Sequence, residues 1–119
     1  MIIRVFLFLA LSFSYFVSAE QISIMSYNLN NLFDAQDDVG KDDKAYLPIA
    51  LKNNDDHIMG CLQVNNSKWR NECLFLDWSE EVVQKKISNI SDLLISMGES
   101  QPDIIAIQEI ENLNVLRML

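Results

Sequence analysis

Two polar side chains, Asn28 and Glu109, each follow an apolar run that is typical of a β-strand. The first run, residues 21–27, reads QISIMSY and leads into Asn28-Leu29-Asn30-Asn31, a group of residues that favours turns. The second run, residues 103–108, reads DIIAIQ and is apolar on both faces, as expected of a strand buried between layers. A carboxylate can bind a cation, and the bound cation can then bind a phosphate group. These two strand ends are therefore a candidate ligand site.

The segment between the two runs must bring these ends together, and it contains a clear amphipathic helix. Apolar residues recur there at spacings of 4, 3, 4 and 3, on one helical face, at Val83, Ile87, Ile90, Leu94 and Met97. Ser79 is suited to cap the helix, two glutamates follow in its first turn, and Gly98 is suited to end it. A strand, a helix and a strand predict an α/β fold that begins with a βαβ unit and parallel strands. Asn28 and Glu109 then emerge side by side at the carboxyl edge, where ligands gather, although strands that leave a core commonly end in polar residues.

Residues 1–19 have the pattern of a secretory signal peptide. Arg4 supplies the positive start, an apolar run follows, and Val17-Ser18-Ala19 is a cleavage-like ending. We expect cleavage after Ala19, a secreted or periplasmic mature chain, and no stable membrane association. The alternative is a membrane anchor at residues 2–18, but this run is shorter than the roughly 20 residues that span a bilayer.

Removal of that segment takes away one of nine basic residues and none of 17 acidic residues, which leaves a net charge of −9. This balance argues against a basic groove for nucleic acid, but it permits a metal-bridged phosphate substrate. The remaining 100 residues suffice for one small domain. Its two cysteines, Cys61 and Cys73, favour a disulfide in an exported chain, with two free buried thiols as the alternative.

The middle of the chain gives weaker signals. Residues 34–56 are polar and predict a solvated loop, and the acidic spacing in residues 37–43 does not fit a calcium-binding loop. We assign no firm secondary structure to residues 59–78 beyond short helical turns. His57 is expected to be an exposed loop residue without a catalytic role, and the two tryptophans, Trp69 and Trp78, are expected to pack in the core or an interface.

Two segments carry a resemblance to a known family. Residues 24–34, IMSYNLNNLFD, resemble the opening strand of the endonuclease/exonuclease/phosphatase superfamily, which is DNase I-like. Residues 101–112, QPDIIAIQEIEN, resemble the Pro-Asp-apolar-Gln-Glu segment of the same superfamily. Residues 69–78, WRNECLFLDW, further resemble an insertion of secreted bacterial members. The resemblance implies a two-sheet β-sandwich flanked by helices, of which this chain supplies the opening elements.

The same resemblance implies a catalytic metal site. Glu109 matches the family's metal-binding glutamate, and Asn28 matches the asparagine that supports the metal and the phosphate. Mg²⁺, or another divalent cation such as Mn²⁺ or Ca²⁺, is the implied cofactor, and a phosphodiester of the DNA or RNA kind is the implied substrate. Gln108 is expected to point to the opposite face of a regular strand, so we leave it out of the metal ligands.

The chain also departs from the family pattern. The family uses a histidine, an Asp-x-Asn segment and a late Asp-His pair, all downstream of the Gln-Glu motif, whereas this chain has ten residues after Glu109. We therefore expect residues 20–119 to be the N-terminal portion of a truncated domain, with little or no activity and poor stability alone. The alternative is a small secreted binding module, stapled by a disulfide and without catalytic activity. Substrate identity and oligomeric state stay open.

Overall fold

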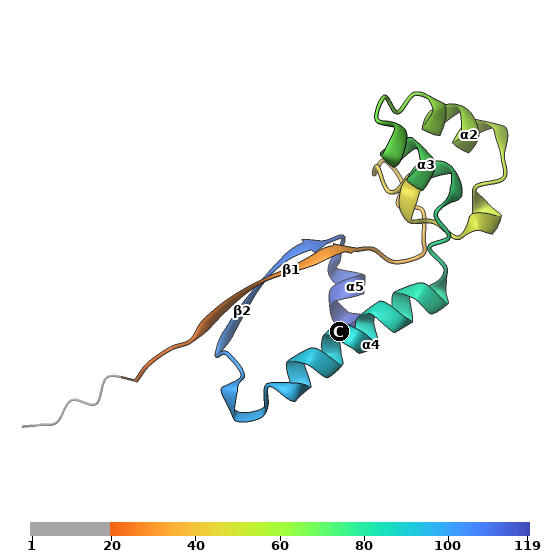
Figure 1. Cartoon of the computed structure of the whole chain (residues 1–119). Helices are drawn as coiled ribbons and strands as arrows, with labels where there is room; N and C mark the ends of the chain where they lie inside the picture. Colours follow the sequence, from red (N-terminus) through yellow and green to blue (C-terminus); the bar gives the residue numbers. More distant parts are fainter. Residues whose placement is uncertain (1–19) are drawn as a thin grey trace, which may run out of the picture.

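The computed structural model describes residues 20–119, so the predicted signal peptide lies outside the described residues. This part of the chain is a mixed α/β structure with a two-stranded parallel sheet and four helices (Figure 1). Within residues 20–119, no helix combines the length and the apolar character that crossing a membrane requires.

The two predicted strands are present and parallel. β1 (Ile24–Leu32) pairs with β2 (Ile104–Ile110) in a register that runs from Ile24 opposite Ile104 to Asn28 opposite Gln108. Both strands begin later than predicted, at Ile24 and Ile104, and both end later, because pairing resumes at Leu32 and Ile110 after an irregularity.

The expectation that the second strand is buried on both faces is wrong. No residue of β2 is fully buried, and Ile104 is 52% exposed. Side chains on one face of the sheet, including Tyr27 and Ile107, pack against the hydrophobic core. The opposite face, which includes Ser26, is exposed.

The predicted helix is α4 (Glu80–Ser96), which packs its apolar face against the sheet (Figure 1). The Ser79 hydroxyl caps it by accepting a hydrogen bond from the Val82 backbone N–H at 3.4 Å. Gly98 follows the helix with φ +52°, a left-handed conformation that favours glycine, and begins the 3₁₀ turn η3 (Gly98–Ser100). α5 (Leu113–Met118) completes the core, which contains Leu29, Leu32, Trp78, Val83, Ile87, Ile90 and Val115.

The middle of the chain forms a separate helical lobe. It consists of η1 (Lys44–Tyr46), η2 (Ile49–Leu51), α2 (Asp55–Leu62) and α3 (Ser67–Phe75). Cys61 on α2 and Cys73 on α3 form a disulfide, as predicted. The two helices replace the short helical turns that the sequence suggested.

Residues 34–56 are largely exposed, as predicted for a solvated loop, but some of their polar side chains are buried. Asp43 is 1% exposed, and Lys52 is 3% exposed. The Lys52 Nζ donates hydrogen bonds to the carbonyl oxygens of Ala45 at 2.8 Å and Glu72 at 3.3 Å, so it joins η1 to α3. Burial lowers the pKa of Lys52 to about 8, and the negative charge of Asp77 opposes this shift. The segment is therefore held by buried polar contacts.

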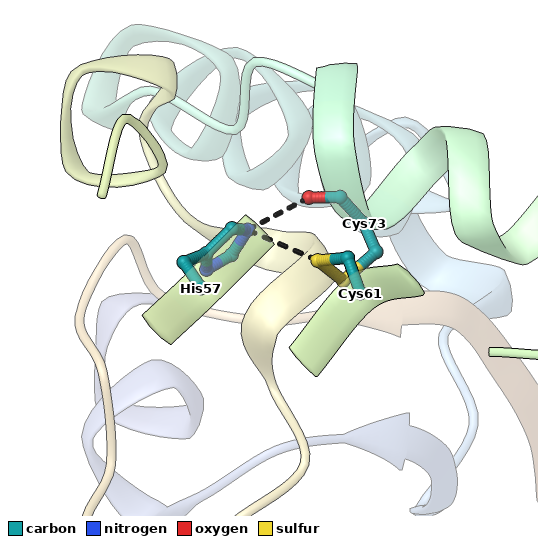
Figure 2. Close-up of side chains that lie close together, drawn as sticks. All are labelled: His57, Cys61 and Cys73. Carbon is teal, nitrogen blue, oxygen red and sulfur yellow. Dashed lines mark hydrogen bonds between the residues drawn. A yellow bond between two sulfur atoms is a disulfide. The ribbon is translucent and has the colours of Figure 1, made fainter. Parts of the chain in front are cut away.

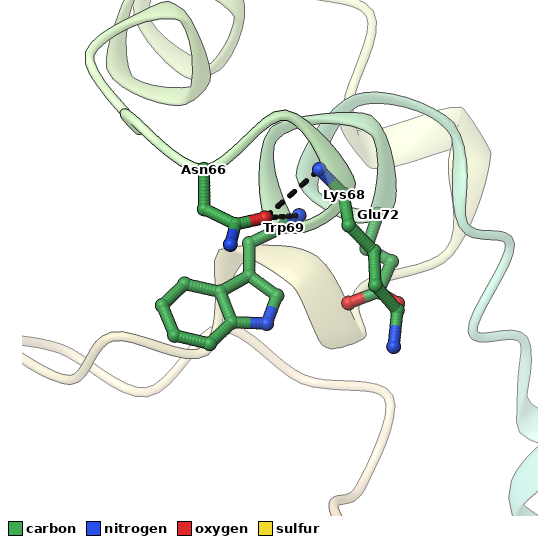
Figure 3. A network of polar contacts seen from close by, with 4 residues as sticks. All are labelled: Asn66, Lys68, Trp69 and Glu72. Atoms are coloured by element: carbon green, nitrogen blue, oxygen red, sulfur yellow. Dashed lines mark hydrogen bonds and ion pairs between the residues drawn. The ribbon is translucent and has the colours of Figure 1, made fainter.

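The two tryptophans have different environments. Trp78 is 8% exposed in the core, as predicted, and its Nε1 donates a hydrogen bond to the Phe33 carbonyl at 3.1 Å. Trp69 is 62% exposed, so of the two expected environments, the core or an interface, the core is excluded for it. It lies in the first turn of α3, where Asn66 caps the helix by accepting hydrogen bonds from the backbone N–H groups of Lys68 and Trp69 (Figure 3). An exposed ion pair, Lys68 to Glu72 at 3.7 Å, follows on the same helix.

We predict that the disulfide is the main stabiliser of the helical lobe. The bond joins residues 12 positions apart and closes a loop of that size in the unfolded chain, so its loss should lower the free energy of unfolding by about 3 kcal/mol. Urea denaturation of the wild type with and without dithiothreitol, and of Cys61→Ser/Cys73→Ser, measures this difference. Equal midpoints for the oxidised and reduced chains would contradict it.

Candidate functional site

The structure brings Asn28 and Glu109 together. The Asn28 Nδ2 donates a hydrogen bond to Glu109 Oε1 at 2.6 Å, and the Asn31 backbone N–H donates to Glu109 Oε2 at 3.0 Å. The Asn28 Oδ1 accepts a hydrogen bond from the Asn30 backbone N–H at 2.7 Å. Both side chains are exposed to solvent. One oriented carboxylate and one oriented amide therefore meet at the carboxyl end of the sheet, where the sequence predicted them.

An unusual backbone conformation shapes this site. Asn30, Asn31 and Glu109 have φ values of +53°, +62° and +57°, and they are the non-glycine residues with positive φ in residues 20–119. Asparagine tolerates this left-handed region better than most residues, whereas glutamate does so rarely. The strands lose regular pairing at this point, between Asn28 and Leu32. Strained backbone of this kind clusters at functional sites. The bend formed by Asn30, Asn31 and Glu109 is therefore the strongest candidate site in the described chain.

Lys86 on α4 supports the bend, and the sequence analysis missed it. Its Nζ donates hydrogen bonds to the carbonyl oxygens of Asn30 at 2.6 Å and Asn31 at 3.0 Å. The same ammonium lies 5.1 Å from the ring centroid of Trp78. Burial lowers the pKa of Lys86, and the charge of Glu109 opposes this shift. Its position three residues after Val83, on the predicted apolar face, was the signal that Lys86 lies at the edge of the core.

Aromatic side chains pack below the bend. Tyr46 stacks on Phe33 with ring centroids 4.1 Å apart and meets Trp78 edge to face at 5.3 Å. Burial raises the pKa of Tyr46, and the charges of Glu72 and Glu109 raise it further, while a hydrogen bond with the Asn31 side chain lowers it. Tyr46 thereby connects the helical lobe to the strand ends.

A groove of about 580 Å³ adjoins the bend on the side of the helical lobe. Asn30 and Asn31 form one wall, and α3 contributes the exposed ring of Trp69. Lys44 and Lys68 also line the groove, but Asp42 and Glu72 balance their charges. The groove thus offers room and an aromatic surface beside Asn31, whose backbone N–H donates to Glu109, and it has no net positive charge.

His57 is not the exposed loop residue that the sequence predicted. It lies on α2, is 7% exposed, and its Nε2 is 2.9 Å from the Cys73 carbonyl oxygen and 3.2 Å from the Cys61 Sγ (Figure 2). A disulfide sulfur carries no proton, so the Nε2–H is the donor to both acceptors. His57 therefore supports the disulfide within the helical lobe.

The expected orientation of Gln108 depended on a regular strand, and the strand is irregular at the next residue. The prediction that Gln108 and Glu109 point to opposite faces assumed a regular strand, and the left-handed conformation of Glu109 breaks that regularity. The Gln108 Nε2 donates a hydrogen bond to the Ser26 Oγ at 2.7 Å. Gln108 thus holds the neighbouring part of β1 in register.

A second polar cluster lies beside the site, where the chain leaves both strands. The Glu111 Oε2 accepts a hydrogen bond from the Asp34 backbone N–H at 2.9 Å, and the Asp43 Oδ2 accepts one from the Asp38 backbone N–H at 2.8 Å. The Asn112 Nδ2 donates to Asp34 and Asp38, each at 3.3 Å. Burial raises the pKa of Glu111 to about 7; the Asp34 backbone hydrogen bond lowers it, and the charges of Asp34, Asp38 and Asp43 raise it.

Comparison with known proteins adds no assignment. No protein-family model matches the chain, and no curated protein and no solved structure matches it either. The resemblance of residues 24–34 and 101–112 to a phosphodiesterase family therefore stays a prediction, and the geometry of the strand ends is the main evidence on function.

We predict that Lys86 stabilises the left-handed bend. Lys86→Met keeps an unbranched side chain but removes the ammonium that donates to two carbonyl oxygens and lies over the Trp78 ring, so it should lower the free energy of unfolding by about 1 kcal/mol. Urea denaturation measures this change. Lys85→Met is the matched control, because Lys85 is exposed, and it should change stability by less than about 0.5 kcal/mol. Equal effects of the two variants would show that Lys86 does not hold the bend.

Proposed function

We propose that this chain carries the metal-binding part of a phosphodiesterase site, with Glu109 as the metal ligand and Asn28 as its partner. The observation that carries the proposal is the Glu109 carboxylate, which is exposed, oriented by Asn28 and Asn31, and held on a left-handed backbone. Each carboxylate oxygen has one hydrogen-bond donor and so retains a lone pair for a cation. Within residues 20–119, no Lys or Arg forms an ion pair with Glu109 at 4.0 Å or less.

A hard divalent cation suits this arrangement. Mg²⁺ is typically held by one or two carboxylates and keeps several waters, which substrate phosphate oxygens can replace. When bound, the cation supplies positive charge that polarises a phosphate and stabilises a leaving oxygen. The chain's own residues orient the carboxylate, keep one side of the site open, and provide the adjoining groove for the organic part of the ester. Mn²⁺ and Ca²⁺ fit the same ligands.

The proposal includes the fold of the endonuclease/exonuclease/phosphatase superfamily. In a two-sheet sandwich flanked by helices, one sheet face is covered by helices and the other packs against a second sheet. The sheet of this chain has α4 against one face. Its opposite face is uncovered in the described chain and is apolar at one end, where Ile24 is 69% and Ile104 is 52% exposed. That surface is where a second sheet would pack. We propose an exported location for this protein on the basis of residues 1–19 alone.

Metal binding is the first test. Mn²⁺ added to the isotope-labelled chain should broaden the amide signals of residues 28–31 and 109 selectively, because the ion is paramagnetic and would be held by Glu109. Glu109→Gln removes the charge and should abolish this broadening. Glu99→Gln is the matched control, since Glu99 is exposed in η3 at the other end of β2, and it should leave the broadening intact. Broadening that is spread evenly over the acidic surface, or that survives Glu109→Gln, would refute the site.

Substrate binding is the second test. A thymidine dinucleotide contains a phosphodiester, which should bind the same cation as Glu109. Its addition should tighten Mn²⁺ binding about tenfold, because the binding of the two ligands is coupled. Unlinked thymidine lacks the phosphate and should have no effect. We expect little or no hydrolysis of plasmid DNA with Mg²⁺, because His57, the histidine of the described residues, lies against the disulfide and away from Glu109. Coupling with thymidine as strong as with the dinucleotide would favour the alternative of a binding module without phosphate chemistry.

A further inference from the structure

Two buried carboxylate oxygens in the described chain have no hydrogen-bond partner, and both belong to one cluster. They are Asp43 Oδ1 and Glu111 Oε1. Within residues 20–119, every other buried side-chain nitrogen or oxygen atom has a hydrogen-bond partner. Carboxylate oxygens of Asp38, Asp43 and Glu111 lie within 4.8 Å of one another. Asp43 is 1% exposed, so water does not compensate its charge.

The donors around this cluster are already used. The Asp38 backbone N–H bonds the other oxygen of Asp43, and the Asp34 backbone N–H bonds the other oxygen of Glu111. In the part of the chain that the structure describes, the ion pair within 4.0 Å is Lys68 with Glu72, so no Lys or Arg neutralises these carboxylates. Buried charges are normally paired or bind a metal, and orphaned buried oxygens call for a physical reason.

We propose that Asp38, Asp43 and Glu111 form a calcium-binding site that is distinct from Glu109. Ca²⁺ binds oxygen ligands at about 2.3–2.6 Å, so ligands on opposite sides of the ion are about 5 Å apart, which agrees with the spacing of this cluster. Three carboxylates and an enclosed position favour Ca²⁺ over Mg²⁺, which is usually held by one or two carboxylates and keeps its waters. The Asp34 carboxylate lies next to the site through Asn112 and adds negative charge.

The site would connect the two ends of the crossover. Asp38 and Asp43 follow β1, whereas Glu111 follows β2, so one ion would tie the loop after the first strand to the end of the second. The sequence did not reveal this set, because the acidic spacing of residues 37–43 fits no calcium loop and the third ligand lies about seventy residues later. A shared proton between Asp43 and Glu111 is the competing explanation for the unpartnered oxygens.

The test measures the melting temperature of the full chain at pH 7.5 in EDTA and in CaCl₂. At calcium concentrations about 100-fold above the dissociation constant, we expect the melting temperature to rise by about 10 °C. Asp43→Asn should remove most of this rise and, in EDTA, should melt at or above the wild-type temperature, because it removes an unpaired buried charge. A purely structural role for Asp43 predicts a lower melting temperature in both conditions.

Asp42→Asn is the matched control, because Asp42 is the exposed neighbour and lies outside the cluster. It should retain the full calcium effect. If Asp43→Asn does not fold, Asp38→Asn replaces it. Calorimetric titration with CaCl₂ in the Glu109→Gln background should then give one site, and adding Asp38→Asn should remove it. No calcium effect up to 10 mM, an equal loss in Asp42→Asn, or a melting temperature that rises on acidification without any response to calcium would overturn the proposal.

The two metal sites can be separated by the same variants. Glu109→Gln should leave the calcium effect on melting unchanged, and Asp43→Asn should leave the Mn²⁺ broadening at residues 28–31 in place. In the Glu109→Gln background, calorimetric titration with CaCl₂ should detect only the site formed by Asp38, Asp43 and Glu111. A calcium effect that disappears with Glu109→Gln would mean that the ion binds at the strand ends, and the inference about Asp43 would be wrong.

Discussion

The hydrogen bond between Asn28 and Glu109 determines the geometry of the carboxyl end of the sheet. It joins residues 81 positions apart, and it forms where regular pairing of the two strands is interrupted. The second carboxylate oxygen of Glu109 accepts the Asn31 backbone N–H, and this contact requires the left-handed turn at Asn30 and Asn31. The Lys86 ammonium donates hydrogen bonds to the Asn30 and Asn31 carbonyl oxygens that the turn exposes. Strain in the bend, the charge of Glu109 and the position of α4 are therefore parts of one arrangement.

The parts of the fold that could be predicted from the sequence are those with strong periodic signals. The helix from Glu80 to Ser96 follows directly from its apolar spacing, its Ser79 cap and Gly98, because each feature reports a local energetic preference. The two strands and their parallel order followed from the crossover rule, which also placed Asn28 beside Glu109. The exposed face of β2 was not foreseen, because the apolar side chains of Ile104 and Ala106 predict burial. Only the tertiary structure shows that this face is uncovered.

The helical lobe and the polar contacts around it were beyond prediction for a different reason. Residues 34–56 are rich in charge, and a charged residue normally indicates solvent, yet Lys52 and Asp43 are buried through contacts with residues distant in sequence. His57 became a buried donor because α3 places the Cys73 carbonyl next to it, which no local pattern encodes (Figure 2). Similarly, Lys86 is recognisable as a supporting residue only when the carbonyl oxygens of the bend are in place. Long-range polar partners, unlike helical periodicity, leave no regular trace in the sequence.

Burial separates the possible roles of the two carboxylate groups at the strand ends. Glu109 is exposed, so a cation bound there would keep coordination positions open to solvent. Two residues later, Glu111 belongs to the cluster with Asp38 and the buried Asp43, where a cation would meet three protein carboxylates. An open position is what catalysis by a metal requires, whereas a closed one suits stabilisation of the fold. We therefore assign the proposed catalytic cation to the exposed Glu109 and the proposed structural ion to the cluster that contains Glu111.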